Sequence, residues 1–304
     1  MTFPRLTAGA ACAALAIALL AGDAGAHGFA GARFFPATIL TDDPFVADEL
    51  SLPTIAGSPR DADGAHEFGL DWDLAKRITP DLGISFGQGW KYLKPSGSPA
   101  VTGLDAFHAG LDYQLFRDGP REAIGLVGLH ASFGHTGRIA VGAPDFTTLS
   151  PTVAFGKGFG DLQQSLSWLR PIAVTGNMSV DFPTKTTSAD TTNPNNFNYG
   201  FAFEYSLEYL QRQVRDVGLR PPFNRMIPLV EVAFTTGLNR GAGGQTVGTV
   251  QPGIIWAGQF VQVGAEVILP ATRSTGRGFG GVVQLHFYLD DLFPGSIGRP
   301  IFGN

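Results

Sequence analysis

The chain has 304 residues, a formal net charge of −5 and only 15% charged residues. Soluble domains of this size usually carry about 25% charged residues, so the composition argues against an ordinary soluble domain. The negative charge also argues against a nucleic-acid partner, which needs a basic surface.

The first 26 residues have the pattern of a secretory signal peptide. Arg5 supplies the positive charge, residues 6–20 form an apolar segment rich in Ala and Leu, and residues 24–26 match the small-x-small cleavage pattern. Cleavage would make His27 the first residue of an exported chain. The single cysteine, Cys12, lies within this peptide, so we expect a mature chain without disulfides or thiolate metal sites.

Beyond residue 26, no apolar run reaches the roughly 20 residues that a transmembrane helix needs. Apolar and polar residues instead alternate with a period of two in eleven segments, which predicts strands with one apolar face. In chain order the segments lie near 67–74, 82–87, 107–115, 121–133, 148–158, 165–180, 197–210, 227–238, 248–257, 259–269 and 278–289.

The clearest of these segments is 197–210. Every odd position from Phe197 to Tyr209 is aromatic or Leu, and the even positions are small or polar. In a helix these apolar residues would point in all directions, whereas in a strand they form one face. The segment covers the about 9–11 residues that a tilted strand needs to cross a bilayer. Its acidic even face is typical of a wall that faces a wet lumen.

The links between the segments alternate between short and long. Tight turns are expected at 79–81, 117–121, 160–163 and 258. Longer polar or Gly/Pro-rich links are expected at 58–65, 92–102, 135–146, 181–196, 239–247 and 270–277. Short periplasmic turns and longer outer loops are typical of outer-membrane barrels, so this alternation predicts the orientation. The long basic segment 211–226 is the exception, because it falls on the predicted periplasmic side.

The number of strands follows from parity. A bacterial barrel has an even number of strands, so eleven segments require one more, upward strand before residue 58. Residues 48–56 can supply it despite Pro53. In the alternative, residues 27–57 fold into the lumen as a small plug.

We therefore predict an all-β fold, a transmembrane antiparallel up-and-down β-barrel of about 12 strands. The expected parts are a signal peptide (1–26), an N-terminal segment that can plug the lumen (27–47), the barrel (48–290) and a C-terminal extension (291–304).

Short motifs in the C-terminal half have the order and spacing of a known family. They are Asn198-Tyr199-Gly200-Phe201, Glu204-Tyr205-Ser206-Leu207, Pro228-Leu229-Val230-Glu231-Val232, Gln251-Pro252-Gly253-Ile254, residues 262–270 and Leu285-His286-Phe287-Tyr288-Leu289. Over roughly residues 66–290, the sequence resembles the outer-membrane transporters of the phenol-degradation MetA-type family. The resemblance implies a bacterial outer-membrane barrel that passes small, often hydrophobic compounds, and it supplies no catalytic residues.

Parity places a set of ionisable side chains on the face away from lipid, because a charge on the lipid side costs a few kcal/mol at mid-depth. The candidates for the lumen lining are Glu67, Asp71, Asp73, His108, Asp112, Glu204, Glu208, Glu231, Glu266 and His286. They predict a polar, cation-preferring lumen. In the alternative, they pair with Arg and Lys from other strands and seal a narrow barrel.

The expected function is a passive channel or transporter in the bacterial outer membrane for small solutes, hydrophobic or aromatic ones among them. Its expected partners are outer-membrane lipid, a small-molecule solute and the outer-membrane assembly machinery, with no cofactor and no metal. A structural or adhesive barrel that binds partners through its outer loops, especially 181–196, is one alternative.

A membrane-embedded lipid-acting enzyme is the other alternative. Residues 130–132, His-Ala-Ser, resemble the His-x-Ser element of outer-membrane lipid A deacylases, in which the His activates the Ser. The alternation turns both side chains inward, away from lipid, so we do not expect an enzyme. His27 could chelate copper with its terminal amine, but no second ligand cluster accompanies it. Residues 276–281 match the letters of the dinucleotide fingerprint but precede a strand instead of a helix.

Overall fold

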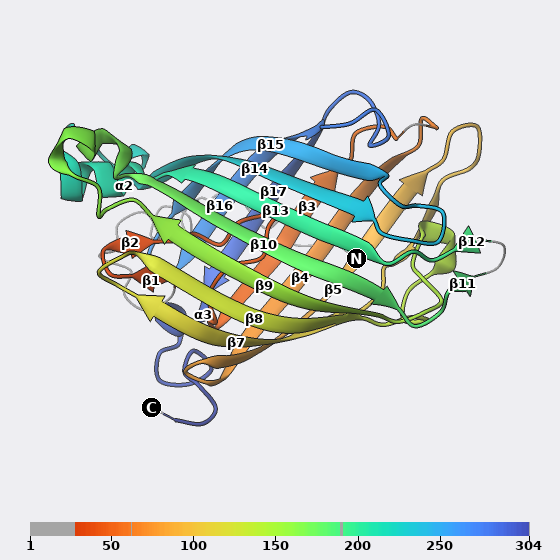
Figure 1. Cartoon of the computed structure of the whole chain (residues 1–304), viewed down its shortest axis with the longest axis horizontal. Helices are drawn as coiled ribbons and strands as arrows, with labels where there is room; N and C mark the ends of the chain where they lie inside the picture. Colours follow the sequence, from red (N-terminus) through yellow and green to blue (C-terminus); the bar gives the residue numbers. More distant parts are fainter. Residues whose placement is uncertain (1–27, 62, 189–190, 304) are drawn as a thin grey trace, which may run out of the picture.

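The computed structural model describes residues 28–61, 63–188 and 191–303. The predicted signal peptide and His27 lie outside these residues. The described chain forms a closed, antiparallel β-barrel of twelve strands (Figure 1). The predicted fold class and the predicted strand count are therefore confirmed.

The wall follows the order of the sequence, because each strand pairs with the next one along the chain. Its strands are β3 (Glu49–Gly57), β4 (His66–Thr79), β5 (Leu82–Lys94), β7 (His108–Asp118), β8 (Ala123–Ser132), β9 (Thr148–Gly158), β10 (Ile172–Pro183), β13 (Asn196–Tyr205), β14 (Met226–Gly237), β15 (Thr246–Ala257), β16 (Val261–Pro270) and β17 (Gly280–Tyr288).

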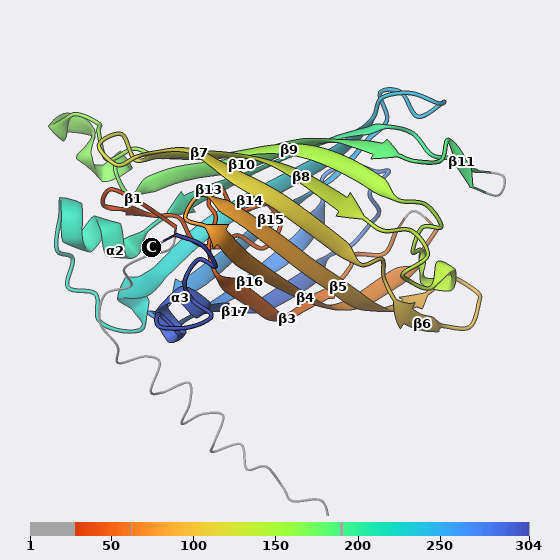
Figure 2. The same ribbon diagram turned by 90° about the horizontal axis from the view of Figure 1, so that it is seen from below.

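The smaller elements lie at the two ends of the barrel. They are β1 (Phe29–Ala30), β2 (Arg33–Phe34), β6 (Val101–Leu104), η1 (Ile139–Val141), η2 (Gln164–Leu169), β11 (Thr187–Ser188), β12 (Thr191–Thr192), α2 (Leu207–Tyr209), η3 (Leu210–Val214), η4 (Phe223–Arg225) and α3 (Leu289–Leu292). In Figures 1 and 2, β1, α2 and α3 share one end with the described C-terminus, and β11 lies at the other. We call the first the periplasmic end, following the predicted orientation. None of the helices in the described ranges is long and apolar enough to span a membrane.

The strand that parity required before residue 58 is β3, and it closes the barrel by pairing with β17. Both ladders of β3 shift register between Ser51 and Thr54. Pro53 lies in this gap, and because proline has no N–H to donate to a ladder, the irregularity accommodates it within the wall. The closing strand is thus built around the residue that made it the weakest strand in the sequence.

Two predicted strands were too long at the periplasmic end. The strand expected from residue 165 begins at Ile172, because residues 164–169 form η2. The strand expected to reach residue 210 ends at Tyr205, because Ser206 accepts a hydrogen bond from the backbone N–H of Tyr209 and caps α2. The link at 159–171 is therefore not the tight turn that the sequence suggested.

The two faces of the wall differ as the alternation predicted. Large apolar side chains are exposed on the outside, including Leu70, Leu111, Leu129, Val153, Phe203, Val230, Ile254, Val267 and Val283. Buried polar side chains occupy the inside, including Gln114, Thr152, Thr175, Glu204, Glu231, Gln251, Gln262, Glu266, Gln284 and His286. An apolar exterior around a polar interior is the pattern of a barrel surrounded by lipid.

We expect an arginine on this exterior to be costly only at mid-depth. Val283 lies in the middle of β17 and is 51% exposed, whereas Val247 lies near the outer end of β15. Val283→Arg should lower the free energy of unfolding by about 2–4 kcal/mol, and Val247→Arg by about 0–1 kcal/mol. Reversible denaturant unfolding in lipid vesicles measures both. Equal losses at the two positions would contradict the assignment of these faces to the bilayer.

Candidate functional site in the barrel lumen

A segment of the chain that precedes the wall occupies the lumen. This lumen segment, residues 35–47, is held by the carboxylate of Glu231 on β14, which is fully buried. Glu231 accepts hydrogen bonds from the backbone N–H groups of Ile39 (2.8 Å), Leu40 (3.1 Å) and Thr41 (2.9 Å), and from the Thr41 hydroxyl (3.0 Å). Successive N–H groups that point at one anion form a strong cradle for it.

Other wall strands also contact the lumen segment. Gln114 on β7 accepts a hydrogen bond from the Val46 N–H (3.1 Å) and donates one to the Pro44 carbonyl (3.2 Å). Gln262 on β16 donates to the Ala37 carbonyl at 2.5 Å. Because β7, β14 and β16 lie at separate places around the barrel, the segment is fixed across the lumen and not along one side.

Two wall glycines leave room for this segment. A Cβ atom at Gly83 would lie 2.4 Å from Cγ1 of Val46, and one at Gly264 would lie 2.7 Å from Cδ1 of Ile39. Both distances are shorter than any normal contact between carbon atoms. The inner wall is therefore shaped to the segment that it holds.

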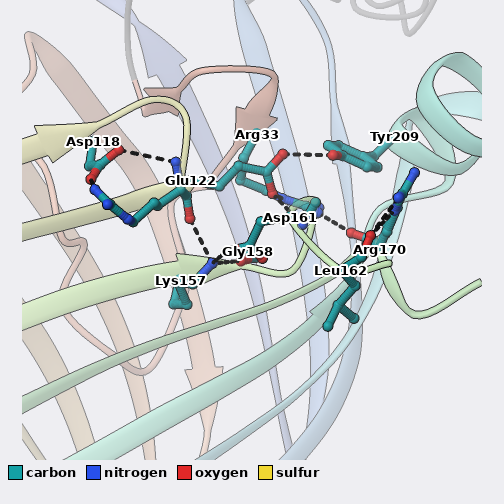
Figure 3. Close-up of polar contacts among 11 residues, drawn as sticks. Arg33, Asp118, Glu122, Lys157, Gly158, Asp161, Leu162, Arg170 and Tyr209 are labelled. Carbon is teal, nitrogen blue, oxygen red and sulfur yellow. Dashed lines mark hydrogen bonds and ion pairs between the residues drawn. The ribbon is translucent and has the colours of Figure 1, made fainter. Parts of the chain in front are cut away.

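A buried arginine anchors the periplasmic end of the segment (Figure 3). Arg33 donates from Nε to Glu122 Oε2 (3.2 Å) and from a terminal nitrogen to the Pro171 carbonyl (3.0 Å). Its guanidinium lies 3.9 Å from the ring centre of Tyr209, whose hydroxyl donates to Glu122 Oε1 at 2.6 Å. Burial and this carboxylate raise the pKa of Tyr209 to about 12. The hairpin of β1 and β2 is thus fastened to two turns of the wall and to α2.

The central cavity is a space of about 300 Å³ between the lumen segment and the wall. It is lined by Asp42, Asp43, Glu49, Asp73, His108, Asp112, His130 and Gln284, among others. Two wall pairs stand side by side in it: His108 Nε2 lies 2.6 Å from Asp73 Oδ1, and His130 Nε2 lies 3.0 Å from Asp112 Oδ1. Each histidine therefore orients a carboxylate toward the same space.

Two further cavities lie toward the ends of the barrel. The outer cavity, about 390 Å³, is lined by Asp61, His66, Glu67 and Asp71 together with small and apolar residues. The periplasmic cavity, about 240 Å³, has an aromatic and charged lining that includes Phe29, Phe34, Tyr209, Arg212 and Arg225.

The structure distributes the predicted lumen residues over these sites. Asp73, His108 and Asp112 line the central cavity, and Glu67 and Asp71 line the outer cavity.

The remaining predicted residues on the wall are buried inside it. Glu204 accepts a hydrogen bond from Thr175 (3.2 Å), Glu231 binds the lumen segment, and His286 shares a hydrogen bond of 2.8 Å with Ser51. Glu266 is also buried.

The prediction for Glu208 was wrong. This residue lies in α2, beyond the end of β13, where it pairs with Arg212 at 3.1 Å. The apolar alternation continues past Tyr205 in the sequence, but the cap at Ser206 turns the backbone into a helix. Glu208 therefore lines the periplasmic cavity and not the wall of the lumen.

Sequence reasoning missed the acidic residues that approach from the N-terminal side. Asp42 and Asp43 belong to the lumen segment, which has no periodic pattern, and Glu49 is the first residue of β3. For Glu49 a signal existed, because polar Glu49 and Ser51 lie on either side of apolar Leu50, which is the alternation expected of a strand with a polar lumen face. Among the described residues, no group of three or more His, Cys, Asp or Glu side chains could hold a metal ion.

The comparisons with known proteins agree on the architecture. No protein-family model matches the sequence, and no curated protein is significantly similar to it. An outer membrane channel from Pseudomonas putida F1 has 12% sequence identity, with 80% of this chain and 95% of that one aligned at a TM-score of 0.51.

Two other solved structures are more distant. The NanC porin aligns with 78% of this chain and 98% of its own at 8% identity and a TM-score of 0.46. LpxR from Salmonella typhimurium aligns with 79% of this chain and 99% of its own at 11% identity and a TM-score of 0.43. At such identities the likeness is one of fold, an outer-membrane β-barrel, and it does not identify the MetA-type family.

We expect the Glu231 carboxylate to keep the lumen segment in place. Glu231→Ala leaves three buried or half-buried N–H groups without an acceptor, at up to about 1–3 kcal/mol each, so the segment should leave its position and single-channel conductance in planar bilayers should rise. Glu204→Ala is the matched control, since it removes a buried carboxylate from the adjacent strand that bonds to Thr175 instead. If Glu231→Ala conducts like the unmodified protein, the segment does not limit the pathway.

Proposed function

We propose that the protein is a passive channel of the bacterial outer membrane for small solutes, with a preference for cations. One observation carries the proposal. The ionisable side chains that line the central and outer cavities are carboxylates and histidines, and among the described residues no Lys or Arg belongs to either lining. Two cations lie next to the lining of the outer cavity: Lys91 is 3.3 Å from Glu67, and the Arg60 guanidinium is 3.4 Å from His66.

An acidic lumen raises the local concentration of cations and repels anions. Low-dielectric walls strengthen this field, because they screen charge less than water does. Rings of Asp and Glu select cations in the same way in other channels. The name of the Pseudomonas protein, an outer membrane channel, supports the same class of function for a chain of this fold.

A preference for hydrophobic or aromatic solutes is the finer part of the proposal. Its support is the resemblance of the sequence to the MetA-type transporters and the aromatic lining of the periplasmic cavity, where Phe29 and Phe34 contact each other with ring centres 5.1 Å apart. The two acidic cavities favour solutes that also carry positive charge.

We further propose that the protein has no lipid-hydrolysing activity. His130 bonds to Asp112 inside the barrel, and Leu129 beside it is exposed on the outer wall. A lipid substrate in the bilayer would face Leu129 and not His130. Lipid hydrolysis by the refolded protein that is lost in the Ser132→Ala variant would contradict this proposal.

We expect cation selectivity that depends on the wall carboxylates. In planar bilayers with a KCl gradient, the reversal potential of the refolded protein should show that K⁺ permeates better than Cl⁻. The double variant Asp73→Asn/Asp112→Asn should reduce this ratio several-fold, because it removes two charges from the central cavity. Asp118→Asn, at the periplasmic end of β7 and away from the central cavity, is the control. A lack of conductance and of solute flux would exclude the channel function.

A further inference from the structure

The central cavity contains buried acceptor atoms without donors. Oε1 of Glu49 and Oε1 of Gln284 have no hydrogen-bond partner among the described residues, and both side chains line the cavity. The two residues are only 5% and 7% exposed. The other carboxylate oxygen of Glu49 lies 3.4 Å from His286 Nε2. Because a buried acceptor without a donor is unfavourable, these two oxygens require a donor that enters the cavity.

The charge of the cavity favours a positive donor. Five carboxylates line it, and they come from three wall strands and the lumen segment: Asp42, Asp43, Glu49, Asp73 and Asp112. Two histidines, His108 and His130, are the basic groups of the lining, so carboxylates remain in excess even when both histidines are protonated. A neutral donor would satisfy the oxygens and leave this excess of like charge in place.

The rest of the lining favours an organic cation over a metal ion. Leu40, Phe45 and Leu126 form an apolar part of the cavity, which can contact a short hydrocarbon chain. No group of three metal-binding side chains occurs in the described residues. A volume of about 300 Å³ suits a small organic molecule.

We propose that the central cavity binds a small aliphatic diammonium ion. One ammonium group donates hydrogen bonds to Glu49 and Gln284, and the other lies among the carboxylates of Asp42, Asp73 and Asp112. The hydrocarbon chain between them lies against the apolar part of the lining. This assignment of a substrate class rests on the proposed channel function, because the solute reaches the cavity through the lumen.

Calorimetric titration of the full-length, refolded protein with 1,4-diaminobutane tests the proposal. Saturable binding is expected, whereas 1,4-butanediol, which has the same chain without charge, should not bind. Glu49→Gln keeps the shape of the side chain and should weaken binding about tenfold or more, because the ammonium then meets a neutral amide in place of a carboxylate. Asp118→Asn, at the periplasmic end of β7 and outside the linings of the three cavities, is the control and should bind like the unmodified protein.

Several outcomes would overturn the proposal. These are no saturable binding, equal binding by Glu49→Gln, and binding of tetramethylammonium or K⁺ as tight as that of the diamine, which would make the cavity a general counterion site. Should Glu49→Gln fail to fold, Asp112→Asn in the same cavity provides the second variant, with the same expected loss. Cation-selective conductance without diamine binding contradicts this inference alone, whereas absence of conductance contradicts the channel function.

Discussion

Closure of the wall between β17 and β3 is the constraint on which the rest of the structure depends. In lipid, a backbone N–H or C=O without a partner cannot turn to water, so a sheet with free edges is not viable. The ladder from Gly281 to Tyr288 removes both edges at once. It also determines where the lumen segment lies, since residues 35–47 lead into β3 and lie inside the ring that this strand completes.

The lumen segment makes the inside of this barrel unlike a water-filled pore. Its backbone is bonded by wall carboxylates and amides, so the segment replaces water as the partner of the inner wall. The space left is divided into separate cavities with different linings: acidic in the centre and toward the outer end, aromatic and partly basic at the periplasmic end. In the proposed channel, a solute would therefore meet a succession of environments, each with its own chemistry.

The wall could be predicted from the sequence, because a period of two is a local property and faces are assigned by parity. Positions such as Asp73, Asp112 and Glu231 followed directly from their apolar neighbours. Strand ends were less accessible, since a single cap at Ser206 outweighs alternation that continues to Tyr209. For the lumen segment, the sequence suggested a plug within residues 27–47 but none of the contacts that hold it. Its main contact joins Ile39 to Glu231, 192 residues away, and a local sequence pattern cannot predict a contact at that separation.

The chain is held on both sides of the lumen segment, at Arg33 before it by the buried contact with Glu122 and at Glu49 after it by the ladder of β3. A chain held at two points has a high effective concentration at any site between them. When a hydrogen bond to Glu231 breaks, the donor stays nearby and rebinds before the segment can drift. The fraction of time that the segment spends in the lumen therefore depends on its two attachment points as well as on the strength of each contact.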